Sequence, residues 1–297
     1  MTSTLPATVD VAPHPPTVTA DGPDRTAYDV ITPASGRPSR WRRIVSFWPL
    51  GIYTTPLLIL LVWQLTSALG LLPPAIAPAP TAVLAEAVYQ NESGTLFTDI
   101  ATSLERAGLG LALGLAVAIP TAVLAGLFRA GEMAFNGIYQ IVNTIPLLAI
   151  LPLMVVWFGI DELTKVLLIS IGAAVPMYLN LFAAIRGVDN QFIEMARAAG
   201  ASRLTVLRRV VFPGALPGFL VGLRFSLAYS VLGLVAAETV NAEEGIGHMI
   251  LLSQTYMRHE GVFLGLAIYA LFGLAADQIV RVLERTLLRW RNTRVQA

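Results

Sequence analysis

The chain has 297 residues, of which 55% are hydrophobic and 13% charged, with a formal net charge of +1 and a mean hydropathy of +0.67. An ordinary soluble domain carries about 25% charged residues, and a soluble protein this apolar would expose large adhesive patches. The soluble globular class is therefore excluded. The sequence has no cysteine, three scattered histidines and no phosphate loop of the form GxxxxGK[ST]. We expect no catalytic residue, no metal site and no cofactor bound by this chain.

Residues 1 to about 40 are rich in Pro, Thr, Ala and Asp and hold few large apolar residues. Such a segment cannot bury enough apolar surface to offset the entropy of ordering. We expect residues 1–40 to form a disordered cytoplasmic tail and residues 41–297 to form one transmembrane domain.

Six apolar stretches follow the tail, each long enough to cross a hydrocarbon core about 30 Å thick at 1.5 Å per helical residue. The sequence therefore predicts an all-α, polytopic membrane protein with six transmembrane helices. The predicted spans are residues 48–69, 104–128, 138–158, 163–185, 217–237 and 262–283.

Arginines are distributed asymmetrically about these spans. They gather before the first span, between the fourth and fifth spans and after the sixth, segments that share one side if there are six crossings. The opposite side holds few basic residues and many acidic ones. Because basic residues mark the cytoplasmic side, we expect both termini to be cytoplasmic.

Polar and proline residues inside the predicted spans are candidates for a solute pathway. A proline removes a backbone donor that lipid cannot replace, so it marks either a wet cavity or a packing kink. Arg224 is the one basic residue well inside a predicted span, and it either serves function or extends to the cytoplasmic interface. Glu238 is either a pathway residue or an interfacial carboxylate, and the two asparagines either meet solute or bond between helices. The candidate pathway residues are Asn143, Pro146, Asn180, Arg224 and Glu238.

The fifth predicted span carries small residues at every fourth position, which places them on one helix face. Small residues allow close helix–helix packing where lipid supplies no hydrophobic drive. The helix-packing residues are Gly214, Gly218, Gly222, Ser226 and Ser230.

Residues 187–212 form a long connection between the fourth and fifth spans. Phe192, Met195, Ala196 and Ala199 follow helical i, i+3, i+4, i+7 spacing and predict a short helix with one apolar face. Gly200 can adopt a positive φ and end this helix. Ser202 is suited to cap a second short helix that ends at Pro213. The small residues of the first helix favour insertion into a protein groove over a linker lying on the bilayer.

The loop also resembles the EAA signature of ABC importer permeases, which reads EAA, three residues, Gly, nine residues and I-x-L-P. Here the matching segments are Glu194-Met-Ala196, Gly200 and Val210-Val-Phe-Pro213, with Met195, Val210 and Phe212 as apolar replacements. Segments 145–161, 212–224 and 237–247 are similar to the branch that serves aliphatic sulfonates, taurine and nitrate. The resemblance covers residues 56–290. It implies ATPase-coupling roles for Glu194, Met195, Ala196, Gly200, Ala201 and Pro213.

The resemblance implies partners as well as a fold. A second permease copy would complete the channel as a homodimer in the bacterial plasma membrane. Two ATP-binding subunits, holding ATP-Mg, would receive the cytoplasmic loop, and an extracytoplasmic solute-binding protein would deliver the cargo. Contact with lipid is expected and contact with nucleic acid is not.

Three functional readings compete. The first is an ABC importer permease for aliphatic sulfonates, with taurine, nitrate or a pyrimidine-type precursor as alternative cargo for the same architecture. The second is a self-contained secondary transporter, which would need its own coupling-ion site and inverted repeats, neither of which is visible. The third is a membrane enzyme, which lacks a nucleophile–base or metal pattern.

Overall fold

The computed structural model describes residues 51–239 and 242–289, and these residues form helices and connecting loops without a strand. The predicted tail at residues 1–40 and the start of the first predicted span lie outside the described residues. The chain divides into two compact units, residues 1–58 and 59–297. The elements are α2 (Gly51–Ala68), α3 (Pro80–Glu92), α4 (Thr95–Leu127), α5 (Arg129–Thr144), α6 (Leu147–Phe158), α7 (Glu162–Arg186), α8 (Asn190–Ala198), α9 (Arg203–Val206), the π-helical turn η3 (Leu207–Val211), α10 (Phe212–Glu238), α11 (Ile246–Thr255) and α12 (His259–Leu287).

Helix α7 is the centre of the second unit, with α4 and α10 packed against it. Small residues make these contacts possible. A Cβ added at Gly114 of α4 would lie 2.5 Å from the carbonyl oxygen of Ser170, and one added at Gly233 of α10 would lie 3.1 Å from the Cα of Ile169. The backbones of three apolar helices therefore meet almost directly.

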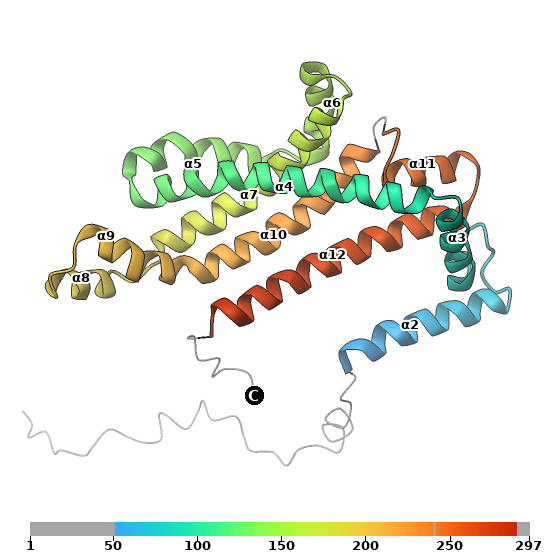
Figure 1. Ribbon diagram of the computed structural model, residues 1–297, viewed down its shortest axis with the longest axis horizontal. Coiled ribbons are helices and arrows are strands. Elements are labelled where there is room, and N and C mark those ends of the chain that lie inside the picture. The colour runs from blue at the N-terminus through green and yellow to red at the C-terminus, as the bar shows by residue number, and fades with distance from the viewer. Residues whose placement is uncertain (1–50, 240–241, 290–297) are drawn as a thin grey trace, which may run out of the picture. The chain divides into compact units, whose positions relative to one another are not determined.

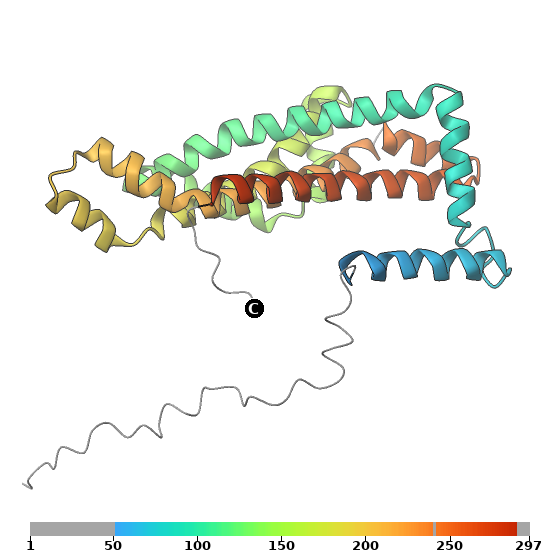
Figure 2. The ribbon, with the colours of Figure 1, turned by 60° about the horizontal axis from the view of Figure 1, so that its bottom comes forward.

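The bundle has two ends that are easily recognised. Helices α8 and α9 lie at one end, and α3 and α11 lie at the other, in both views (Figure 1, Figure 2). We call the first the loop end and the second the far end. Two apolar clusters fill the bundle. The cluster towards the loop end includes Met177, Tyr178 and Leu181, and the other includes Leu168 and Leu234.

The outward faces of the long helices are apolar. Leu109, Leu113 and Val117 of α4 and Leu271 and Leu274 of α12 all expose between 40% and 61% of their surface. Side chains of this kind are costly in water but not in hydrocarbon. Their exposure agrees with a bundle surrounded by lipid.

Among the described residues, four helices are long and apolar enough to span a membrane, namely α4, α7, α12 and the helix that runs through Arg203–Glu238. The pair α5 and α6 adds a fifth span if the two are counted together, and the apolar part of α2, Thr54–Ala68, is shorter than a span. The prediction of an all-helical membrane protein is confirmed, whereas the count of six spans stays a prediction.

The third predicted span, residues 138–158, is not one straight helix. Helices α5 and α6 are separated at Ile145 and Pro146 and are bent by 106° to one another. Ile145 has an extended backbone, with φ −86° and ψ 123°. A proline disfavours helical geometry in the residue before it, so Pro146 ends α5 and begins α6.

The second predicted span also differs, because α4 begins at Thr95, nine residues before the predicted start. Gly94 precedes it with φ +79°. Arg106 therefore lies in the same helix as the second span, and the prediction that Arg224 is the one basic residue well inside a span stays a prediction. The first residues of α4 include polar ones, so hydropathy does not predict that the helix begins before the apolar stretch. Hydropathy reports composition and not backbone geometry.

Candidate functional site

Residues 187–212 form the helix–glycine–helix arrangement that the sequence predicts, and they project at the loop end (Figure 1). Asp189 caps α8 by accepting a hydrogen bond from the backbone N–H of Gln191 at 2.9 Å. Gly200 turns the chain with φ +78°. Ser202 then caps α9 by accepting from the N–H of Thr205 at 3.3 Å. Each corner of the loop is thus set by local chemistry.

Helix α8 has apolar residues on two sides, one packed against the bundle and one exposed. Ile193 and Ala196 pack against the cluster at the loop end. Phe192 and Met195 are 58% and 63% exposed. The predicted helix is confirmed. Ile193 gives α8 a second apolar row, which faces the bundle. Phe192 and Met195 are left available to another surface.

A shallow groove of about 630 Å³ separates α8 from the start of α10. Phe192, Met195, Ala199, Val210 and Pro213 contribute to its largely apolar lining. The exposed side of α8 and this groove together form a continuous apolar surface at the loop end.

The six predicted coupling residues fall into three positions. Glu194 and Met195 are exposed on α8, Ala196 and Ala201 are partly buried against the bundle, and Gly200 forms the corner between the two helices. The sixth, Pro213, lies two residues into α10.

The prediction that the second loop helix ends at Pro213 is wrong. Helix α9, the π turn η3 and α10 form one continuous helix over Arg203–Glu238, 36 residues long. Proline has no N–H to donate, and the irregular π turn just before Pro213 accommodates it without a break. The loop is therefore joined rigidly to the spanning helix.

The stripe of small residues on α10 faces α7. A Cβ added at Gly214 would contact Val188, and one added at Gly222 would lie 3.2 Å from the Cβ of Asn180. Ser226 donates from Oγ to the carbonyl oxygen of Ala173 at 2.7 Å. Ser230 is buried on the same face. The geometry of the stripe matches its predicted packing role and identifies α7 as the partner.

Arg224 pairs with acidic residues of α12. Its Nη2 donates to Glu284 at 2.8 Å, and its Nε lies 3.5 Å from a carboxylate oxygen of Asp277. Arg281 also donates to Asp277 at 2.6 Å. With its side chain 37% exposed, Arg224 is a partly solvated member of an ionic cluster between α10 and α12.

Glu238 is enclosed at the far end, among α4, α11 and α12. Its side chain is fully buried. Its Oε1 accepts from Ser103 at 2.7 Å and from Arg106 at 2.8 Å. Its Oε2 accepts from the N–H of Gly247 at 2.9 Å and from the hydroxyl of Tyr269 at 2.8 Å. Four donors on three helices, α4, α11 and α12, surround this carboxylate.

Arg106 extends the same network to α7 and to the turn before α11. Its Nε and Nη2 bind the two carboxylate oxygens of Glu162, each at 2.6 Å, and its Nη1 donates to the carbonyl oxygen of Glu244 at 2.6 Å. Sequence reasoning missed this network. The available signal was the excess of acidic residues on one side of the membrane, but Arg106 is 56 positions from Glu162 and 132 from Glu238.

A hollow of about 320 Å³ lies where α5 and α6 separate. Asn143 and Pro146 line it together with Gly172 of α7 and Tyr229 of α10. Asn180, in contrast, donates to the carbonyl oxygen of Pro176 at 2.8 Å. The structure thus brings two of the five candidate pathway residues together, and the other three lie elsewhere.

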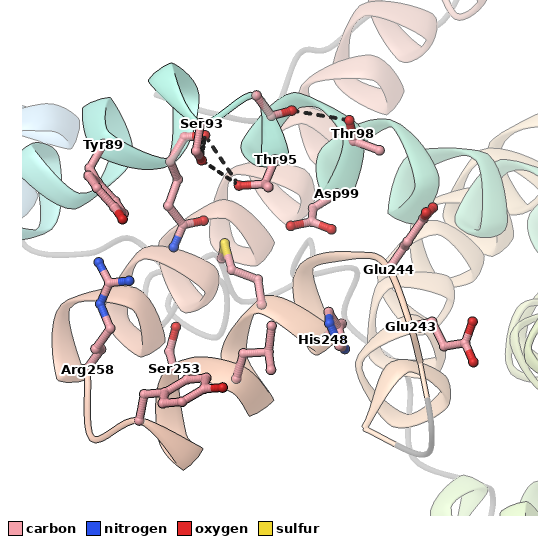
Figure 3. A pocket seen from close by; sticks show the side chains of 15 residues that line it. Tyr89, Ser93, Thr95, Thr98, Asp99, Glu243, Glu244, His248, Ser253 and Arg258 are labelled. Atoms are coloured by element: carbon pink, nitrogen blue, oxygen red, sulfur yellow. Dashed lines mark hydrogen bonds between the residues drawn. The ribbon is translucent and has the colours of Figure 1, made fainter.

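A second hollow, of about 460 Å³, opens at the far end between α3, α4 and α11 (Figure 3). Figure 3 shows Tyr89 and Arg258 facing one another on one side and Asp99 on the other. The guanidinium of Arg258 lies 5.0 Å from the ring centre of Tyr89. Because both acidic and basic side chains line this hollow, its charge does not favour anions alone.

A lipid-facing helical bundle with one interrupted helix, α5–α6, and a helical loop at one end is typical of a membrane transport subunit. Residues 110–289 match the family described as "Binding-protein-dependent transport system inner membrane component". The match covers more than half of the chain, and the chain belongs to this family.

Curated relatives agree with this assignment. The chain is 37% identical over 246 residues to a Bacillus subtilis (strain 168) protein named as an aliphatic sulfonates transport permease, covering 83% of this chain and 89% of the relative. It is 34% identical over 261 residues to the taurine transport system permease protein of Escherichia coli (strain K12), covering 84% of this chain and 95% of the relative. A chain of a crystallised amino acid ABC transporter shares the fold, with a TM-score of 0.55 at 19% identity, covering 69% of this chain and 98% of that chain.

Family membership fixes the biochemical role at a coarse level. The chain is a membrane-embedded permease of an ABC importer and works with ATP-binding and solute-binding components. It is not an enzyme, because ATP hydrolysis in this family belongs to a separate subunit.

Proposed function

We propose that this chain forms the pore through which an ATP-driven importer carries aliphatic sulfonates across the bacterial plasma membrane. The observation that carries the proposal is the loop end, where α8 exposes Phe192 and Met195 and α9 continues without a break into the spanning helix α10. The names of the relatives from Bacillus subtilis and Escherichia coli support a sulfonate as cargo.

We further propose the assembly. Two copies of the chain form a homodimeric pore, with both termini and the loop end in the cytoplasm. Two ATPase subunits, each with ATP-Mg, receive residues 187–212, with Glu194, Phe192 and Met195 in direct contact. ATP binding favours one of two states of the assembly by differential contact with the loop.

The solute would pass the break between α5 and α6. Asn143 offers an amide N–H there and Tyr229 a hydroxyl, both neutral donors suited to a sulfonate oxygen. A pathway without a fixed cation binds the anion weakly, which allows its release. Discrimination among anions then rests mainly with the solute-binding protein.

Uptake of radiolabelled ethanesulfonate into proteoliposomes tests the proposal. Vesicles with the permease, the cognate ATPase and the solute-binding protein should accumulate ethanesulfonate only with ATP. Vesicles that lack the ATPase and carry a proton gradient are the control, and uptake there would instead identify a secondary transporter. Stronger competition by taurine, nitrate or a pyrimidine precursor would reassign the cargo and retain the architecture.

A further inference from the structure

A buried ion pair at the far end is used by no step of the transport scheme described so far. Glu238 is fully buried, and the side chain of Arg106 is 6% exposed. Their 2.8 Å contact joins the last residue of α10 to the middle of α4. Buried charges in a membrane protein are costly, so their presence points to a role beyond filling space.

The pair links α4 and α10 to α7, α11 and α12 at the far end. Through Glu162 it reaches the first turn of α7, and through Tyr269 it reaches α12. Backbone groups of the turn before α11 complete it, since the N–H of Ile246 donates to Ser103 at 2.9 Å. The N–H of Gly245 donates to Asp99 at 2.8 Å, and Asp99 is also a wall of the far-end hollow (Figure 3).

The same pair stands at the end of a continuous helix that starts in the loop. From Arg203 to Glu238 the helix has 36 residues, a length of about 54 Å at 1.5 Å per residue. A displacement imposed on α9 is therefore carried along the helix axis to Glu238. Whether this displacement also moves α4 and α7 depends on the strength of the contacts that link Glu238 to those helices.

The surroundings of Glu238 leave it no alternative position. A Cβ added at Gly245 would lie 2.5 Å from its Oε1 and 2.7 Å from Nη1 of Arg106, and one added at Gly247 would collide with its Cβ. Separating the pair would leave a carboxylate buried without its counter-charge, which is far costlier than exchanging a solvated contact.

We propose that Glu238 and Arg106 are positioning residues that stay paired throughout the transport cycle and make the far ends of α4, α7, α10 and α12 move as one body. This inference rests on the proposed function. Movement of the loop at one end is then delivered to the whole far end and is not lost in sliding between helices.

The variant E238Q tests the anchor in proteoliposomes of the complete transporter, with ATP hydrolysis and ethanesulfonate uptake measured together. Glutamine keeps the shape but places an amide N–H₂ among donors and removes the counter-charge of Arg106, which stays paired with Glu162. The matched control is E86Q, because Glu86 is 9% exposed and pairs with Arg258 at 2.6 Å, outside the hydrogen bonds of Glu238.

We expect E238Q to assemble and hydrolyse ATP while the solute moved per ATP falls about tenfold, and E86Q to keep the wild-type ratio. Equal losses of hydrolysis and uptake in E238Q, or an unchanged ratio, would overturn the inference. Absence of ATP-dependent uptake in the wild type would instead reject the proposed function, a result distinct from either outcome of the variant.

A second measurement needs neither cargo nor a disrupted network. The chain has no cysteine, so E105C and T239C can carry spin labels on α4 and just after α10, in complexes with one labelled protomer. We expect the distance between these two labels to stay constant on ATP trapping. In a separate sample with T239C alone in both copies, we expect the distance between the two copies to change. A nucleotide-dependent change within the labelled protomer would show that the helices slide and would contradict the anchor.

Discussion

At position 200 the backbone has a φ of +78°, and a Cβ added there would meet no atom within 4 Å. The cost of a substitution at this corner therefore comes from backbone conformation alone. Asparagine tolerates the left-handed region, whereas a β-branched residue does not. This separation of causes makes Gly200 an informative residue of the loop.

We expect G200V to lose the loop corner and with it the contact to the ATPase, at a conformational cost of about 1–3 kcal/mol. G200N is the matched control, since it adds a side chain into the same open space and keeps the turn. Co-purification of the ATPase with each variant measures the effect. Recovery of the ATPase with G200V at the wild-type level would reject the docking role of the loop.

The sequence shows that Arg224 lies within a span, but it does not show which residues pair with it. Partly exposed ion pairs contribute about 0–1 kcal/mol, so R224Q should lower the free energy of unfolding only slightly and leave uptake intact. Thermal unfolding and ethanesulfonate uptake check this, with R281Q as the control on the neighbouring pair. Loss of uptake by R224Q in a correctly assembled complex would place Arg224 in the pathway.

At the scale of helices, the stripe on α10 is the feature that the sequence predicts best. Its period of four residues fixes a helix face, and membrane physics assigns close packing to that face. The partner helix could not be predicted, because α7 carries its own small residues among many others of similar type. The structure identifies the interface, for example at Gly218 and Ala184, which would collide if Gly218 had a Cβ.

We expect G218L to destabilise the α7–α10 interface by about 1–3 kcal/mol through overpacking. The control is A228L, since Ala228 lies on the exposed side of the same helix. Unfolding of the purified permease in detergent by heat measures both. Equal stability of the two variants would show that the interface yields easily and that the stripe is not a tight contact.

The sequence does not predict which prolines interrupt a helix. Pro120, Pro152 and Pro176 lie inside continuous helices, whereas Pro146 separates α5 from α6. All four remove a donor in the same way. What differs is whether neighbouring helices hold the chain straight, and that depends on tertiary packing which no local pattern records.

At the scale of the whole molecule, the class, the helical loop and its Gly200 corner follow from the sequence, and the far-end network does not. Hydropathy and the loop motif are local signals, readable within a window of some 20 residues. Glu238 and Arg106 are separated by 132 positions. No periodicity connects residues so far apart, and the fold alone brings them together.

The proposed orientation can be checked in intact cells with a membrane-impermeant maleimide. Y256C, at an exposed position of the far end, should react from outside, and A198C on α8 should react only after the membrane is permeabilised. The cysteine-free wild type is the background control. The reverse pattern would place the loop outside the cell and remove its access to an ATPase.

The direct backbone contact of α4 and α10 with α7 has a consequence for how such permeases diversify. An interface without room for a single methyl group tolerates few substitutions. Substitutions that change cargo specificity are therefore not expected there. Variation that alters which molecule passes must accumulate along the walls of the interrupted helix, around residues 142–150. Attempts to retarget this permease by directed evolution should therefore randomise that segment and leave the glycine-lined seam untouched.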